Sequence, residues 1–327
     1  YLWKHHVLKA EPLASGRMLT AADFDAFVDS LDVDAADTDT SRTEGDDAMF
    51  GDLGAAPDAG AKPPAKKAPK FQFIQAAEYA AQERRVAWMI PGVLPKAELG
   101  GLYGESGAGK SFFVLDMMVA LCAASPWWDK QIQRRHRIAY VAAEGAIGVQ
   151  DRLKAIAIDR GMRLEDLDLF VLGDSPDIMD GETVKDLLRA MSKLGKLDMI
   201  VLDTLAQVTP GANENSSEDM GKALHHAKGL HRATGAMVFL VGHSGKDTTR
   251  GQRGWSGLKG AMDVQLLLTR TATYRAATVA KLKDGEGEGV EFMFNLRSVQ
   301  VGADQDDNPI SSCVVDPVLD ALQLDEL

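Results

Sequence analysis

One segment limits the possible folds of this chain more than any other. Residues 104–111 read Gly-Glu-Ser-Gly-Ala-Gly-Lys-Ser and match the pattern G-x-x-x-x-G-K-[ST]. The apolar pair Leu102-Tyr103 precedes this segment, and a run with helical spacing follows from Phe112. A glycine-rich turn between a strand and a helix predicts a loop whose backbone N–H groups surround phosphates. We therefore expect a strand–loop–helix unit that binds a nucleoside triphosphate.

The loop also predicts individual roles. Lys110 is expected to hold the β- and γ-phosphates of ATP, and Ser111 to provide a hydroxyl ligand for Mg²⁺. The residues expected to contact the nucleotide are Gly104, Glu105, Ser106, Gly107, Ala108, Gly109, Lys110, Ser111 and Phe112. The alternative is a chance glycine-rich turn before a helix, and the flanking strand and helix argue against it.

Two acids are expected at the ends of apolar strands. Asp203 closes the run Met-Ile-Val-Leu-Asp, which predicts a carboxylate that holds the metal through water at the carboxyl end of a strand. Capping of the next helix is the alternative for Asp203. Glu144 closes Ile-Ala-Tyr-Val-Ala-Ala-Glu, and it could serve as the general base if its strand neighbours that of Asp203. The alternative for Glu144 is an exposed acid at a turn, since a glycine follows it.

The rest of the pattern predicts an α/β fold. Short apolar runs alternate with helical stretches, which indicates a mostly parallel sheet covered by helices on both faces. We expect strands at 99–103, 138–143, 167–172, 199–203 and 237–241, and helices at 111–123, 147–160, 183–193 and 217–233. After Gly260 strands follow one another at 264–271, 274–283 and 290–301, which predicts an antiparallel extension of the same sheet at its C-terminal side.

The N-terminal part of the chain differs from the rest. Between Asp23 and Asp52 there are eleven acidic residues and one basic residue, a balance of −10 out of a net charge of −12. The remainder is thus nearly neutral, so the net charge does not exclude a nucleic-acid partner. Residues 19–31 have helical spacing, whereas the stretch from Asp32 to Lys70 is too poor in apolar residues to fold. We expect two parts: residues 1–70 as an acidic, largely disordered tail and linker, and 71–327 as the ATPase domain.

Composition adds two expectations about the environment. The chain has only two cysteines, too few for a disulfide framework, and this is typical of a reducing cytoplasm. No run approaches the roughly 18 unbroken apolar residues of a membrane span, so we expect no membrane partner. The first residue is Tyr1, so we expect a piece of a longer product or a processed chain.

Several ordered motifs resemble one known family. They are Trp88–Pro95, Tyr140–Gly145, Asp151–Ala155, Ser175–Met179, Val201–Leu205, Val238–Lys246 and Arg253–Gly257. Together they resemble the RepA-type helicases of plasmids and phages, which belong to the RecA superfamily of ATPases. The resemblance extends from about Ala87 to Arg297 and leaves the first seventy residues unexplained.

The resemblance implies roles for particular residues. Glu144 matches the catalytic glutamate, and His243 matches a residue that senses the γ-phosphate. This family has two histidines there, and here the first is Gly242. The loop 244–260 then corresponds to a segment that binds single-stranded DNA in the pore of a ring, and its basic members are Lys246, Arg250, Arg253 and Lys259. Residues 210–218 are a candidate second pore loop.

The family also places a cation from a neighbouring subunit at each ATP site. RepA carries an arginine at the position of Asp263, so this chain departs from the pattern. The segment Ala280-Lys-Leu-Lys-Asp-Gly resembles the corresponding K-x-R-x-G segment of DnaB-type helicases, which makes Lys281 and Lys283 candidates. Arg250 and Arg253 are the alternatives.

These observations lead to an expected function. We expect an ATP- and Mg²⁺-dependent helicase that forms a homo-oligomeric ring, with six subunits expected, on single-stranded DNA in replication of a plasmid, phage or mobile element. Replication proteins are further candidate partners, through the N-terminal region. Two alternatives remain open: a RecA-like recombination or repair ATPase that forms filaments on DNA, and a regulatory ATP-binding switch that does not unwind DNA.

Overall fold

The computed structural model describes residues 28–29, 73–81, 87–243, 257–283 and 285–318. They fall into two units, which we describe separately. The smaller unit, residues 37–86, contains the short helix α3 (Ala76–Ala80), and the side chain of Gln75 caps its first turn. The larger unit contains the sheet and the phosphate-binding segment. None of the helices that the structure describes is both long and apolar enough to cross a membrane.

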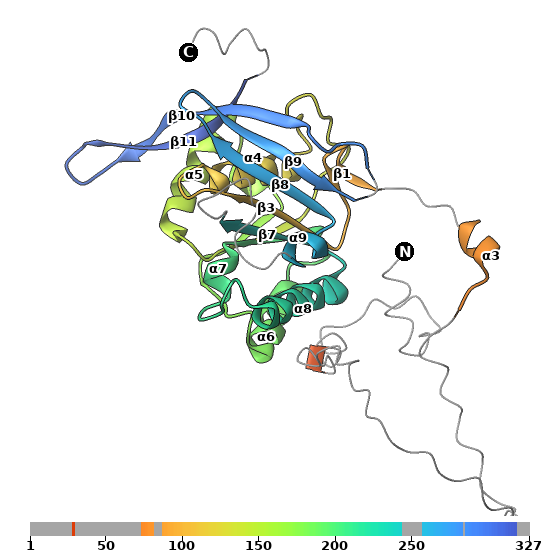
Figure 1. Ribbon diagram of the computed structural model, residues 1–327. Coiled ribbons are helices and arrows are strands. Elements are labelled where there is room, and N and C mark those ends of the chain that lie inside the picture. The colour runs from red at the N-terminus through yellow and green to blue at the C-terminus, as the bar shows by residue number, and fades with distance from the viewer. Residues whose placement is uncertain (1–27, 30–72, 82–86, 244–256, 284, 319–327) are drawn as a thin grey trace, which may run out of the picture. The chain divides into compact units, whose positions relative to one another are not determined.

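The larger unit is built on a nine-stranded sheet with the order β11-β10-β9-β8-β3-β7-β6-β4-β5 (Figure 1). Its strands are β3 (Leu99–Gly104), β4 (Ile138–Ala142), β5 (Leu169–Leu172), β6 (Met199–Asp203), β7 (Met237–His243), β8 (Val264–Arg270), β9 (Arg275–Leu282), β10 (Glu291–Ala303) and β11 (Pro309–Pro317). The six strands from β8 to β5 are parallel, and β8, β9, β10 and β11 pair antiparallel. A separate two-stranded sheet pairs β1 (Trp88–Ile90) with β2 (Leu94–Pro95).

Helices cover both faces of this sheet. They are α4 (Lys110–Ala123), α5 (Ala146–Arg160), α6 (Gly181–Ser192), α7 (Leu205–Val208), α8 (Ser217–Thr234) and α9 (Gly257–Ala261), with a 3₁₀ turn at Leu164–Asp166. In Figure 1, α4 and α5 lie on one face and α6 and α8 on the other. This arrangement confirms the predicted α/β class with a parallel core and an antiparallel C-terminal extension.

The alternation of side chains along each parallel strand divides the core into two clusters. In β6, Met199 and Val201 pack on the α4 face, whereas Ile200 and Leu202 pack on the α6–α8 face. Strands that are buried on both faces need apolar residues at every position, which explains the unbroken apolar runs of the sequence.

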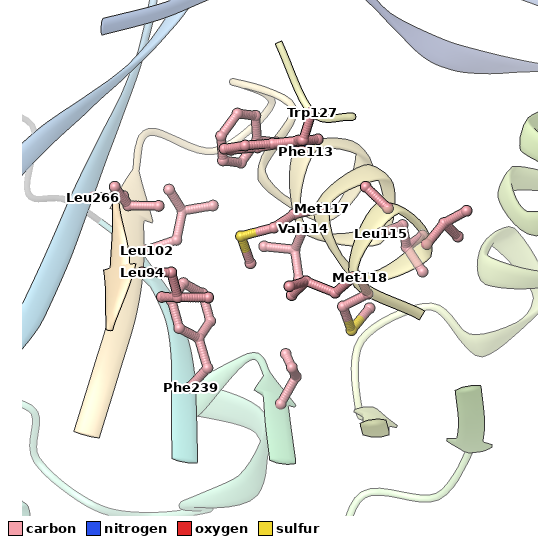
Figure 2. Close-up of a cluster of buried hydrophobic side chains, with 14 of the residues drawn as sticks. Leu94, Leu102, Phe113, Val114, Leu115, Met117, Met118, Trp127, Phe239 and Leu266 are labelled. Carbon is pink, nitrogen blue, oxygen red and sulfur yellow. The ribbon is translucent and has the colours of Figure 1, made fainter. Parts of the chain in front are cut away.

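Helix α4 is apolar on nearly all sides because the sheet and its neighbours surround it. Figure 2 shows its side chains Phe113, Val114 and Met117 among residues of β3, β7 and β8. Its one internal acid, Asp116, is almost fully buried. It accepts hydrogen bonds from Trp127 Nε1 at 3.0 Å and from Arg160. This pairing satisfies a carboxylate that would otherwise destabilise the core.

The predicted element boundaries hold closely. For example, the strand expected at 199–203 is β6 (Met199–Asp203), and the helix expected at 217–233 is α8 (Ser217–Thr234). The hairpin strand β11 was not predicted, because much of it is exposed and lacks an apolar alternation. Of the helix expected at 19–31, the structure describes only Val28 and Asp29. Both are helical; Val28 is buried and Asp29 pairs with Arg189. The expected disordered segment 32–70 lies outside the described residues.

Candidate active site

The glycine-rich segment forms a tight loop between β3 and α4, as predicted. Gly107 and Gly109 have φ angles of 76° and 101°, in the left-handed region that only glycine adopts without strain. Gly104 has a different constraint, since a Cβ atom on it would lie 2.3 Å from the carbonyl oxygen of Leu268 in the neighbouring strand. These glycines thus permit both the turn and the close packing of β3 against β8.

Lys110 is buried beneath the loop. Its ammonium group donates to the carbonyl oxygens of Gly104 and Glu105, at 3.0 and 2.8 Å, and it lies 3.2 Å from Nδ1 of His243. Burial lowers the pKa of Lys110, and the negative charges of Asp203 and Glu144 oppose that shift. A cation at the base of a backbone loop is suited to hold the phosphates of a nucleotide.

Asp203 ends β6 and is fully buried. The hydroxyl group of Tyr140 donates to its Oδ2 at 2.6 Å. Burial raises the pKa of Asp203, while the hydrogen bond from Tyr140 and the influence of the Ser111 hydroxyl act in the opposite direction. Its Oδ1 atom is buried without a hydrogen-bond partner among the residues that the structure describes. A buried acceptor oxygen beside a serine hydroxyl fits a hydrated Mg²⁺, which uses few protein ligands and keeps several waters.

Glu144 lies beside Asp203 because β4 and β6 are neighbours in the sheet, as the proposed catalytic role requires. Its backbone N–H donates to the carbonyl oxygen of Asp203 at 3.1 Å. Its carboxylate accepts from the hydroxyl of Thr204 at 3.2 Å and remains about half exposed, with 52% of the side-chain surface accessible. The carboxylate is therefore held in place and yet open to water.

His243 connects Lys110 with Glu144. It is the last residue of β7, and the register pairs it with Gly104 at the start of the loop. Its Nε2 atom lies 3.8 Å from the Glu144 carboxylate, on the side of the ring opposite the contact with Lys110. One histidine at this position is thus enough to contact both groups.

Tyr140 is a functional residue that the sequence reasoning missed. A tyrosine inside a fully buried strand needs a partner for its hydroxyl, and this was the available signal. Phe112, one of the expected nucleotide contacts, lies under the guanidinium of Arg152, whose Cζ is 4.6 Å from the ring centroid. Arg152 extends from α5, so the helix after Glu144 also reaches the loop.

Lys281 and Lys283, the lysines expected to serve the ATP site of a neighbouring subunit, lie at the opposite end of the parallel strands from the phosphate loop. Lys281 pairs with Gln265 near the amino end of β8, whereas the phosphate loop follows the carboxyl end of β3. Lys281 Nζ donates to the carbonyl oxygens of Lys259, Gly260 and Met262, at 2.8, 3.1 and 2.6 Å, around the end of α9. Lys283 is 63% exposed and lies 3.6 Å from Asp263.

The proposed DNA-binding residues are only partly visible. Lys246, Arg250 and Arg253 lie outside the described residues, and Lys259 is exposed on α9. The candidate second loop, 210–218, is described. Its Glu214 lines a small depression together with Leu205, His243 and Leu258. The loop thus approaches the histidine that contacts the nucleotide site.

Comparison with known proteins agrees with this geometry. A family model described as an AAA domain matches residues 64–249, more than half of the chain. The chain belongs to this AAA domain family.

The curated relatives that the chain resembles are RecA proteins. The RecA protein of Campylobacter lari is 26% identical over 202 residues, which cover 56% of this chain and 52% of that protein. The RecA protein of Helicobacter hepaticus is 28% identical over 202 residues, with the same coverage. The chain spans about half the length of these relatives. A solved structure of the RadB recombinase aligns with a TM-score of 0.44 at 18% identity, covering 64% of this chain and 89% of that one.

The family match and the loop geometry make the chain a RecA-like P-loop ATPase domain. Asp263, where the RepA resemblance predicts an arginine, has a structural role. Its Oδ2 atom accepts hydrogen bonds from the backbone N–H groups of Glu98 and Leu99, both at 3.1 Å. In this AAA domain the position fixes the start of the strand that leads to the phosphate loop.

Proposed function

We propose that this chain hydrolyses ATP in a Mg²⁺-dependent reaction and couples hydrolysis to a single strand of DNA. The observation that carries the proposal is the line of contacts from Lys110 through His243 to Glu144. Lys110 and Glu144 are the two groups that the chemistry needs, and His243 is the last residue before the basic segment 244–259. A change at the nucleotide can therefore reach that segment through one side chain.

Each residue has a defined task in this proposal. Lys110 and the loop N–H groups hold the phosphates, and Ser111 with Asp203 would hold a hydrated Mg²⁺, which would supply positive charge at the phosphate oxygens. The Glu144 carboxylate accepts a proton from the water that attacks the γ-phosphate, since it is open to water on one side. Thr204 orients this carboxylate, and Tyr140 orients Asp203.

His243 is the proposed sensor. With the γ-phosphate bound, Lys110 turns toward the phosphate and gives up its contact with His243. The imidazole then follows the phosphate or Glu144, and His243 directly precedes the basic segment in the sequence. Lys246, Arg250, Arg253 and Lys259 would bind the DNA phosphates, as basic side chains do in sequence-independent binding.

Two forms of DNA-acting ATPase compete within this proposal. The six curated relatives are all named RecA, which supports a recombination or repair ATPase that forms filaments on DNA. The ordered motifs from Trp88 to Arg253 support a ring-forming, RepA-like helicase as the second candidate. The relatives, whose alignments cover more than half of the chain, favour the first form over the second.

The central test is ATP turnover with and without single-stranded DNA. We expect DNA to raise the turnover of the unaltered protein severalfold. Lys110→Ala should abolish nucleotide binding in calorimetry, whereas Glu144→Gln should bind ATP and lose turnover by about 10²-fold or more. If Glu144→Gln retains turnover within a few-fold of the unaltered protein, the catalytic base is another residue. Turnover that DNA leaves unchanged would favour the regulatory switch.

A second experiment distinguishes the two DNA-acting forms. Negative-stain microscopy with ATP and single-stranded DNA would show filaments for the recombination type and closed rings for the helicase type. A strand-separation assay with a forked duplex adds an independent readout, since we expect only the ring form to unwind it. Glu144→Gln serves as the control that assembles without turnover.

A further inference from the structure

Two arginines face each other at the end of the β8–β9 hairpin. Arg270 and Arg275 are direct cross-strand partners. The next residues on the same face, Leu268 and Ala277, belong to the core cluster that contains α4, so both arginines share the face that carries α4. Like charges in this arrangement repel each other and destabilise the strand pair. The pair therefore needs an explanation.

The described part of the chain provides no acid to neutralise the pair. Neither arginine forms an ion pair with a carboxylate there, and Nε of Arg275 is buried without a hydrogen-bond partner. Desolvation lowers the pKa of Arg275 and the charge of Arg270 lowers it further, whereas Cys313 acts in the opposite direction. A buried donor on a charged group without an acceptor is costly, and an anion would remove that cost.

Arg275 lies directly beside the phosphate loop. A Cβ atom built on Gly109 would be 3.3 Å from both Cδ and Nε of Arg275. Gly109 is the last glycine of the loop and precedes the first residue of α4. Because β3 lies between β7 and β8, Lys110 with His243 occupies one side of the loop and Arg275 the other.

From this geometry we infer that Arg275, supported by Arg270, is a second cationic group for the polyphosphate of a nucleoside di- or triphosphate in the loop of the same chain. The planar guanidinium offers several donors that match phosphate oxygens. The phosphate charge would neutralise the pair and provide an acceptor for Nε. This inference rests on the nucleotide site of the proposed function and assigns to it a residue from the antiparallel part of the sheet.

The test compares the affinities of three ligands by calorimetry: ATP, inorganic tripolyphosphate and adenosine. Arg275→Gln should lower the affinities for ATP and for tripolyphosphate by a similar factor, about tenfold or more, because a charge-assisted hydrogen bond is lost. The affinities of Arg275→Lys should fall between those of Arg275→Gln and those of the unaltered protein. Arg163→Gln is the matched control, since Arg163 is 71% exposed and lies before β5, so its affinities should equal those of the unaltered protein.

Thermal unfolding without ligand gives a second readout. Removing one of two repelling charges should leave the melting temperature of Arg275→Gln at or above that of the unaltered protein. Arg270 is exposed, so Arg270→Gln provides a variant with little effect on packing. This variant should also lower the affinities for both ATP and tripolyphosphate.

The outcomes separate this inference from the proposed function. If the unaltered protein binds neither ATP nor tripolyphosphate, the proposed nucleotide site is wrong and the inference with it. If it binds both through Lys110 while Arg275→Gln and Arg270→Gln bind equally well, only the inference is overturned. A loss for ATP without a loss for tripolyphosphate also overturns it, because the contact would then be with the nucleoside.

Discussion

Asp203 shows how a single residue can be unfavourable for folding and required for the site. It lies with no exposed surface at the end of β6, and burial raises its pKa. The Tyr140 hydroxyl satisfies Oδ2, while Oδ1 has no hydrogen-bond partner among the described residues. A buried charged oxygen without a hydrogen-bond donor destabilises the protein, and a metal cation bound there would offset that cost.

We therefore expect Asp203→Asn to stabilise the protein in the absence of metal and nucleotide. Asparagine keeps an acceptor for Tyr140 and removes the buried charge. The gain should be on the order of 1 kcal/mol, or about 2–4 °C in melting temperature, measured with a chelator present. Mg²⁺-dependent ATP turnover should fall sharply in the same variant. A melting temperature that drops by several degrees would mean that the charge stabilises the metal-free fold.

The sequence predicted the residues of this site that follow a motif or end a strand. Lys110 and Ser111 belong to a contiguous pattern, and Asp203 and Glu144 end apolar runs, so strand order alone brings them together. The bond between Tyr140 and Asp203, and that between Asp263 and Glu98, depend on register between strands. Glu98 and Asp263 are 165 residues apart, and no local pattern specifies such a pairing.

At the scale of elements, three parallel strands end at residues of the candidate active site. β3, β6 and β7 are parallel, so Gly104, Asp203 and His243 emerge at one edge of the sheet. In the sequence, residues 244–256 stand between His243 at this edge and α9 (Gly257–Ala261). Lys281 donates a hydrogen bond to the carbonyl oxygen of Lys259 in α9.

Charge reversal in this segment tests its proposed contact with DNA. Lys246→Glu with Arg253→Glu should weaken single-strand binding and reduce the steepness of its salt dependence. Two lost phosphate contacts correspond to about 1.4 in the slope of log affinity against log salt. ATP turnover without DNA should change little. Binding is measured by fluorescence anisotropy over a salt series.

The matched control reverses two exposed basic residues at the opposite edge of the sheet. Arg163 precedes β5 and Lys193 precedes β6, so both lie near the amino ends of parallel strands. Arg163→Glu with Lys193→Glu changes the net charge equally and should leave the slope as in the unaltered protein. Equal slopes for the two double variants would show that the segment is not part of the DNA-binding surface.

At the scale of the larger unit, the sheet separates groups that the proposed reaction needs together. The phosphate loop follows the carboxyl edge of β3, and Lys281 with Lys283 lies at the amino edge of β8. A cation at the opposite edge cannot serve the loop of its own chain, but it can serve the loop of a neighbour. The contacts of Lys281 with three carbonyl groups make Lys283 the freer of the two.

Subunit mixing tests this arrangement. Lys281→Ala with Lys283→Ala should leave ATP affinity nearly unchanged and reduce turnover by about 10³-fold, the usual effect of losing a cation supplied by a neighbour. Mixing this variant with Glu144→Gln, after subunit exchange, should restore part of the turnover. One complete site re-forms where the first variant provides the loop and the second provides the lysines. A mixture no more active than its parents would leave Arg250 and Arg253 as the candidates.

The contacts of Lys110 have one more consequence, which concerns selectivity among small anions. Without nucleotide, its ammonium already has three acceptors, two loop carbonyl groups and one imidazole nitrogen. An arriving anion must replace these acceptors rather than meet a bare charge. Chloride offers a single centre and no directed geometry, whereas a phosphate chain offers several oxygens at suitable spacing. We therefore expect the loop without nucleotide to bind polyphosphates in preference to the abundant monovalent anions of the cell.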